Sequence, residues 1–117
     1  MTEKILVVDD DLDTLKLVGM MLQRQGYNIV AAINGAQALV QMLEAYDVRY
    51  VFGVPGDTSV PLYQALYERR NAIRHILARD ERSAGFMADV YARLSHRPGV
   101  CECPSGAGAL YSAPGIA

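Results

Sequence analysis

The chain has 117 residues, of which 51% are hydrophobic and 21% are charged, and its formal net charge is −2. This balance is typical of one globular domain with a core, and it gives no electrostatic reason to expect binding to nucleic acid or to an anionic membrane. No apolar run approaches the roughly 20 residues of a membrane span and no secretory leader is recognised, so the sequence predicts a cytoplasmic protein.

Short apolar runs alternate with amphipathic stretches along the whole chain. The strands are expected at 4–9, 28–33, 49–54, 73–78 and 100–103, and the helices at 12–25, 36–46, 59–69, 80–94 and 109–117. Short loops between such elements are typical of a parallel sheet covered by helices. Because five such units cannot close a barrel, we predict an α/β fold. It is a flavodoxin-like, doubly wound open sheet of five parallel strands in the order 2-1-3-4-5, with helices on both faces.

The first strand carries the most distinctive pattern in the chain. Four apolar residues, Ile5–Val8, are followed directly by Asp9, Asp10 and Asp11. Such a run predicts a strand buried on both faces, and we expect Val7 to lie between the second and third strands. The acids would then lie at the rim of the sheet. They are interpreted either as a weak Mg²⁺ site at Asp9 and Asp10 or as a solvated acidic rim that caps the first helix.

The motifs KILVVDDD, DTLKLVGMMLQRQGY and VAAINGAQAL fall within residues 3–39. Together they resemble a bacterial response-regulator receiver domain. In that family the acid pair at the positions of Asp9 and Asp10 holds Mg²⁺, which assists phosphoryl transfer to a third aspartate. The segment RYVFGVP has no carboxylate at the end of the third strand, so we expect no phosphorylation.

A second set of motifs falls within residues 36–117: VRYVFGVPG, LYQAL, IRHIL, DE, ADVYAR, GVC and SGAG. These resemble the pyrimidine-binding domain of thiamine-diphosphate-dependent enzymes of the acetolactate synthase group. The resemblance implies that Glu81 is the carboxylate that hydrogen-bonds the aminopyrimidine ring of the cofactor and promotes its activation. It also implies that the pocket around this ring is formed by Val54, Pro55, Gly56, Gly106 and Gly108.

The diphosphate anchor of that family has no counterpart in this sequence. The resemblance implies that a separate domain holds the diphosphate and its Mg²⁺ through a Gly-Asp-Gly motif and a downstream Asn, and that a second subunit completes the site. The motif does not occur in these 117 residues. We therefore expect Glu81 and the pocket residues to be vestigial. A simpler interpretation of Glu81 is an acid in the first turn of a helix, where negative charge is stabilising.

The two resemblances meet near residues 34–39. We interpret the chain as an engineered, designed chimera within one domain, with a receiver-like β-α-β unit at about 1–38 and a thiamine-enzyme-like remainder at about 39–117. This interpretation predicts no native activity, no enzyme and no cofactor. Two alternatives stay open: an acetolactate synthase-like fragment that retains weak thiamine diphosphate binding, and a degenerate receiver that binds Mg²⁺ without phosphorylation. We also expect self-association through exposed apolar surface around Tyr63, Tyr67 and Tyr111.

Overall fold

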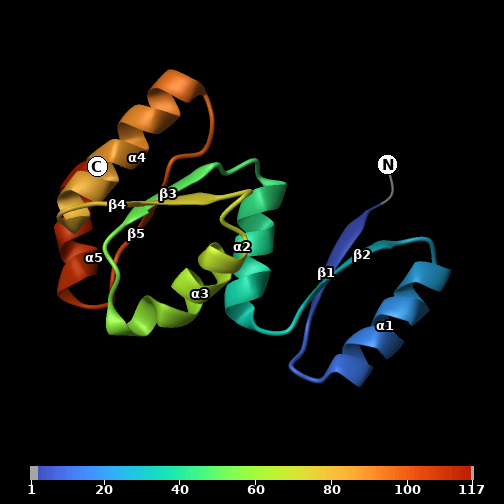
Figure 1. Ribbon diagram of the computed structural model, residues 1–117. Helices are drawn as coiled ribbons and strands as arrows, with labels where there is room; N and C mark the ends of the chain where they lie inside the picture. The colour runs from blue at the N-terminus through green and yellow to red at the C-terminus, as the bar shows by residue number, and fades with distance from the viewer. Residues whose placement is uncertain (1–2, 117) are drawn as a thin grey trace.

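The computed structural model describes residues 3–116, which form two parallel sheets with helices packed against them (Figure 1). The elements are β1 (Lys4–Val8), α1 (Leu12–Arg24), β2 (Asn28–Ala32), α2 (Gly35–Ala45), β3 (Tyr50–Gly53), η1 (Asp57–Ser59), α3 (Val60–Glu68), β4 (Arg74–Leu77), α4 (Glu81–Ser95), β5 (Val100–Glu102), α5 (Ala107–Ser112) and η2 (Ala113–Gly115). The predicted α/β alternation is confirmed. The last helix begins earlier and ends earlier than expected, and residue 117 of its predicted range lies outside the described residues.

The strands do not form the single predicted sheet. β1 pairs in parallel with β2, and a second sheet has the order β4-β3-β5. The prediction of five strands in the order 2-1-3-4-5 is therefore wrong. The strand order differs because both edges of β3 are occupied by β4 and β5: Val51 is paired with His75 on one side and with Val100 on the other. The place beside β3 that was expected for β1 is taken by β5.

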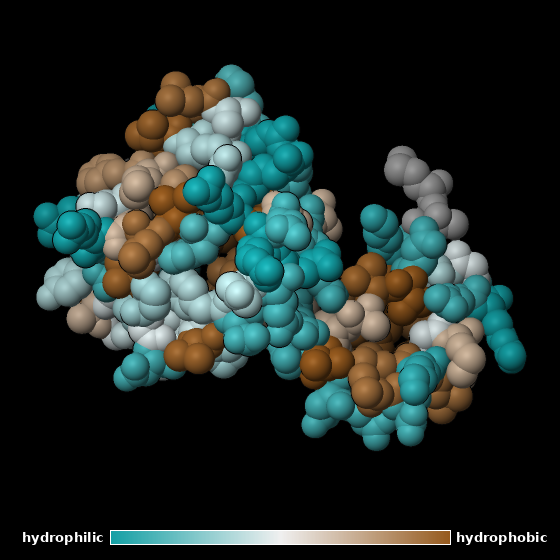
Figure 2. All heavy atoms as spheres, viewed as in Figure 1, coloured by the Kyte–Doolittle hydropathy of each residue, from teal (hydrophilic) through white to brown (hydrophobic). Residues whose placement is uncertain are grey.

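The β1-α1-β2 unit forms a lobe of its own, at the right of Figure 1. Leu15 and Gly19 are the buried residues of α1, and a Cβ on Gly19 would lie 3.8 Å from Cγ2 of Ile29. Without a third strand, β1 stays half exposed. Val7 is only half-buried, so the expectation that it bridges two neighbouring strands is also wrong. In Figure 2 hydrophobic side chains are visible across this lobe.

α2 connects the two lobes. One of its side chains reaches the smaller sheet, where Nε2 of Gln41 donates to the backbone oxygen of Ala31 at 2.9 Å. A cavity of about 270 Å³ lies at this junction; its lining residues are Lys4, Leu6, Val30, Gln41, Met42, Ala45 and Tyr46. On its other side α2 packs against α3, where Nε of Arg69 donates to Oε1 of Glu44 at 2.7 Å.

The larger lobe has three layers, because alternate residues of β3 face opposite helices. Val51 packs with α2 and α3 in a buried cluster that contains Val40, Val48, Ala65, Leu66 and Ile73. Phe52 points to the other face, where it packs against α4 in a cluster with Ala78, Ala84 and Ala88. This layering places the carboxyl ends of β3, β4 and β5 side by side at one edge of the sheet.

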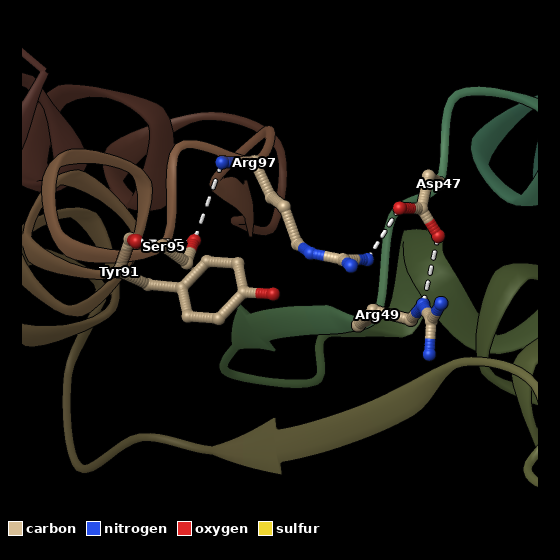
Figure 3. A network of polar contacts seen from close by, with 5 residues as sticks. All are labelled: Asp47, Arg49, Tyr91, Ser95 and Arg97. Carbon is tan, nitrogen blue, oxygen red and sulfur yellow. Dashed lines mark hydrogen bonds and ion pairs between the residues drawn. The ribbon is translucent and has the colours of Figure 1, made fainter.

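A polar network lies at the opposite, amino end of these strands (Figure 3). Nε of Arg49 donates to one carboxylate oxygen of Asp47 at 2.8 Å, and Nη1 of Arg97 donates to the other. The hydrogen bond from Arg49 is the main reason why the pKa of Asp47 lies below its usual value. Behind the pair, Oγ of Ser95 donates to the Tyr91 backbone oxygen at 2.6 Å. The network joins the loop before β3 to the loop before β5.

Candidate functional site

The candidate site begins at the amino end of α4, directly after β4. Asp80 caps the helix: its Oδ1 accepts the backbone N–H of Ser83 at 2.8 Å, and its Oδ2 accepts the Ser83 hydroxyl at 2.9 Å. The backbone hydrogen bond lowers the pKa of Asp80, with the hydroxyl as the second cause. Glu81 is the first residue of the helix, so its carboxylate lies where the helix dipole favours negative charge. The local sequence Asp-Glu-x-Ser thus fixes the Asp80 side chain and places Glu81 in the first turn of α4.

A cavity of about 560 Å³ opens between α4 and α5. Its lining residues are Asp80, Glu81, Arg82, Ser83, Phe86 and Tyr111. Glu81 is half-buried there, whereas Arg82 and Phe86 are exposed. Sequence reasoning missed Arg82, Phe86 and Tyr111. The spacing of four between Arg82 and Phe86 puts both on one face of α4, which is a signal that was present in the sequence. Tyr111 reaches the cavity only through the packing of α5 on α4.

Two glycines of the predicted pocket pack against Pro104, and one of them, Gly108, also lies beside Glu81. A Cβ on Gly108 would lie 3.1 Å from Oε1 of Glu81 and 2.7 Å from Cγ of Pro104. A Cβ on Gly56 would overlap the Cβ of Pro104. The structure therefore brings the turn after β3, the segment after β5 and the start of α4 together, at the carboxyl ends of three adjacent strands. Ligand sites of open α/β sheets lie at this edge.

The remaining pocket residues of the prediction are more scattered. Val54 is half-buried and packs against the Phe52 cluster, while Pro55 is exposed. Gly106 precedes α5 with a φ of 82°, a left-handed conformation that favours glycine, and apart from its chain neighbours no residue within 3–116 has an atom within 4 Å of where its Cβ would be. Gly106 thus serves the turn into α5, and only Gly108 of this pair contacts Glu81.

A second polar cluster lies under the same edge, on the α3 face of the sheet. The Tyr63 hydroxyl donates to Oε2 of Glu102, and the Tyr63 ring meets His75 edge-on, with ring centroids 4.7 Å apart. Burial is the main cause that raises the pKa of Tyr63, followed by the hydrogen bond to Glu102. Burial lowers the pKa of His75, against the charge of Glu102. Nε2 of His75 is buried and has no hydrogen-bond partner among residues 3–116. Sequence reasoning did not bring these three residues together.

The acids of the first strand lie in the other lobe. Oδ1 of Asp9 accepts the backbone N–H of Asp11 at 2.9 Å, Asp10 is exposed, and Asp11 caps α1 through the backbone N–H groups of Asp13 and Thr14. Within residues 3–116 no group of three or more His, Cys, Asp or Glu side chains is arranged to hold a metal ion. The weak Mg²⁺ site at Asp9 and Asp10 stays a prediction, and the capping role expected for this acidic rim is confirmed at Asp11.

Known proteins are similar to this chain in the part that contains the larger lobe. The family model "Thiamine pyrophosphate enzyme, N-terminal TPP binding domain" matches residues 33–117. The chain is 45% identical over 86 residues to the acetolactate synthase large subunit of Cyanidium caldarium, a match that covers 72% of this chain and 15% of that protein. It is 46% identical over 84 residues to a probable 2-ketoarginine decarboxylase of Pseudomonas aeruginosa, with 72% and 15% covered. For a probable acetolactate synthase large subunit of Methanocaldococcus jannaschii, the identity is 44% over 85 residues, with 73% and 14% covered.

The chain therefore belongs to the thiamine pyrophosphate enzymes, through their N-terminal TPP binding domain. It spans about 15% of the length of the relatives that it matches. Membership corrects three predictions. The expectation of a chimera without native activity is wrong, and so are the expectations of no enzyme and no cofactor, because the family and the relatives are enzymes and the family binds thiamine diphosphate. The alternative of an acetolactate synthase-like fragment is the better interpretation.

Proposed function

We propose that this chain supplies the pyrimidine side of a thiamine diphosphate site, with Glu81 as the carboxylate that accepts a hydrogen bond from the aminopyrimidine ring. One observation carries the proposal: the Glu81 carboxylate is held beside the backbone of Gly108, at the carboxyl edge of the sheet and at the wall of a cavity of about 560 Å³. Family membership supports the choice of cofactor.

The residues at this edge fit such a ring. Gly56 and Gly108 have no side chains where Pro104 packs against them, so the segments that carry them lie close together beside Glu81. Phe86 and Tyr111 line the cavity with aromatic surface, which favours a ring and displaces water. When bound, thiamine diphosphate supplies carbanion stabilisation. Glu81 would hold and orient the ring, and Asp80 keeps the first turn of α4 in place by capping it.

The activity of the whole protein follows from the relatives and is part of this proposal. Their names describe acetolactate synthases and a 2-ketoarginine decarboxylase. We accordingly propose that the reaction decarboxylates or condenses a 2-oxo acid. The diphosphate and its Mg²⁺ would be held by a different part of the enzyme, since residues 3–116 contain no group of three or more acidic, His or Cys side chains that could hold a metal.

The smaller lobe receives a separate proposal. The family match begins at residue 33, and β1 and β2 share no hydrogen-bonded sheet with the strands that follow. Both observations distinguish the β-α-β unit at about 1–38 from the matched domain, and its resemblance to a receiver domain stays a prediction. That residues 1–117 make up one domain also remains a prediction, and residues 1, 2 and 117 lie outside the described part.

Self-association is also proposed, but at a different surface from the one expected. Tyr63 is half-buried and bonded to Glu102, so it contributes little to an exposed patch, whereas Tyr67 and Tyr111 are exposed. Another apolar surface is on α4, where Phe86, Met87 and Val90 line a shallow hollow with Phe52 and Tyr91. Analytical ultracentrifugation tests this surface, because Val90→Glu would shift the chain toward the monomer. A monomer in the unsubstituted chain at high concentration would contradict the proposal.

No helix within residues 3–116 has the length and apolar character needed to cross a bilayer. The expectation of a cytoplasmic protein stays a prediction, and so does the expectation that the chain does not bind nucleic acid.

Calorimetric titration of the full chain tests the main proposal. Thiamine diphosphate and unphosphorylated thiamine should bind with affinities within about tenfold of each other, because this chain recognises the pyrimidine, and inorganic pyrophosphate should not compete. Glu81→Gln should weaken both ligands at least tenfold, which corresponds to about 1.4 kcal/mol. The matched control Glu68→Gln removes an exposed carboxylate on α3 and should leave binding unchanged. Equal affinity of Glu81→Gln and the unsubstituted chain would remove the role assigned to Glu81.

A further inference from the structure

Pro104 lies between two glycine backbones at the carboxyl end of β5. A Cβ on Gly108 would lie 2.7 Å from its Cγ and 2.8 Å from its Cδ, whereas a Cβ on Gly56 would overlap its Cβ. The nearest atoms of the proline ring differ at the two glycines: they are Cγ and Cδ at Gly108, and Cβ, followed by Cγ at 3.3 Å, at Gly56. Close packing of this kind leaves no space for an added methyl group on either side.

Glu81 lies on the side of Gly108 that faces α4. The same Cβ position on Gly108 is 3.1 Å from Oε1 of Glu81, so the proline ring and the carboxylate both occupy the space that a side chain at Gly108 would need. Among residues 3–116 neither a hydrogen bond nor an ion pair holds the Glu81 side chain. The close approach of Oε1 to Gly108 is therefore the contact of this carboxylate on which the inference rests.

We propose that Pro104 is a positioning residue, which fixes the backbone of Gly108 and through it the carboxylate of Glu81. The pyrrolidine ring is suited to this role, because it has no rotamers to relax and its φ is fixed near −65°. The inference rests on the proposed function of Glu81. It adds that the turn after β3, the segment after β5 and the start of α4 are set relative to one another by this one ring.

Second-site rescue tests the contact atom by atom. Gly108→Ala adds a methyl group that meets Cγ and Cδ of Pro104 and lies 3.1 Å from Oε1 of Glu81, and Pro104→Ala deletes the two ring atoms. The double variant should therefore recover the part of the loss that comes from the shorter contacts with Pro104. Gly56→Ala meets the Cβ of Pro104, which alanine retains, so Pro104→Ala should not rescue it. If these substitutions only destabilised the fold, Pro104→Ala would not rescue Gly108→Ala while failing to rescue Gly56→Ala.

Two readouts follow the carboxylate itself. The first is the ¹³C resonance of the Glu81 side-chain carboxyl, assigned by its loss in Glu81→Gln. Gly108→Ala should shift this resonance, and the double variant should return it toward its original position. The second is calorimetric affinity for thiamine diphosphate, which Gly108→Ala should reduce at least tenfold and the double variant should restore to within about threefold. Gly35→Ala, where nothing lies within 4 Å, and Pro98→Ala, in the exposed turn before β5, are the matched controls.

Each outcome decides the proposal. An unmoved Glu81 resonance in Gly108→Ala and Pro104→Ala, or effects of the two substitutions that simply add, would overturn it. If Gly108→Ala does not fold, Pro104→Ala alone decides, because removal of the ring edge should still shift the resonance. Absence of any thiamine diphosphate binding by the unsubstituted chain would contradict the proposed function, while the resonance would still report whether Pro104 positions Glu81.

Discussion

Tyr63→Phe removes one oxygen atom and isolates the contribution of the hydrogen bond between α3 and β5. In the structure this hydroxyl donates to the carboxylate of Glu102, and both residues are half-buried. A hydrogen bond to a charged group contributes about 1.5–3 kcal/mol, and its loss leaves a carboxylate that is partly removed from water. The aromatic ring is retained, so its edge-on contact with His75 persists. We expect the free energy of unfolding to fall by about 1.5–3 kcal/mol.

Urea denaturation, followed by circular dichroism at pH 7, measures this loss. Tyr67→Phe is the matched control, because it removes the same atom from the same helix at a residue that is 64% exposed and whose hydroxyl makes no side-chain hydrogen bond within residues 3–116. The control should stay within about 0.5 kcal/mol of the unsubstituted chain. A loss below about 0.5 kcal/mol in Tyr63→Phe would show that the carboxylate finds water instead, and it would refute the reasoning.

Three further predictions address the pH dependence, the core and the acidic rim. Burial lowers the pKa of His75 in the folded chain, so below the ordinary value of about 6.5 the unfolded chain binds the proton more readily and stability is lost as the pH falls. Between pH 7 and pH 5 His75 should contribute a slope of at most about 1.4 kcal/mol per pH unit to the free energy of unfolding, and His75→Gln should abolish this contribution. Identical pH profiles of stability for the variant and the unsubstituted chain would contradict this account. Ile73 is 0% exposed, so Ile73→Ala should cost about 2–5 kcal/mol in urea unfolding, whereas Leu77→Ala, at a residue that is 67% exposed, should cost less than about 0.5 kcal/mol. Similar losses would mean that the buried position described for Ile73 is incorrect. Millimolar Mg²⁺ should raise the melting temperature slightly and Asp10→Asn should remove this effect, whereas an unchanged melting temperature would exclude the predicted site at Asp9 and Asp10.

The local structure could be predicted because its signals are close in sequence. Asp11, Asn34 and Asp80 each cap the helix that follows, and their side-chain oxygens accept backbone N–H groups two or three residues ahead. Gly26, with a φ of 90°, ends the first helix as its type suggests. Such contacts need no knowledge of the rest of the chain.

The topology could not be predicted in the same way. The run Ile5–Val8 has the composition of a strand buried on both faces, yet β1 has a single neighbour and stays half-buried. Both edges of β3 offer the same hydrogen-bonding groups, and periodicity does not say whether β1 or β5 occupies the second edge. The pairing of Val51 with Val100 depends on packing between residues far apart in the chain.

The same distinction between local and long-range signals applies to the candidate site. Glu81 and the two contacting glycines could be found from the family resemblance, because their motifs are contiguous. The contact of Pro104 with Gly56 and Gly108 joins segments after different strands, and the cluster of Tyr63, His75 and Glu102 joins α3 to β4 and β5. No spacing rule within one element relates these positions.

The central claim is that thiamine diphosphate meets this chain at Glu81, and chemical-shift mapping tests it most directly. In ¹⁵N-labelled chain titrated with thiamine diphosphate, the largest amide shifts should fall at Glu81 and Gly108, with a smaller change at Gly56. Amides of the β1-α1-β2 lobe should stay in place, since that lobe lies on the other side of α2 (Figure 1). Largest shifts within residues 4–32, or no shifts at millimolar cofactor, would contradict the claim.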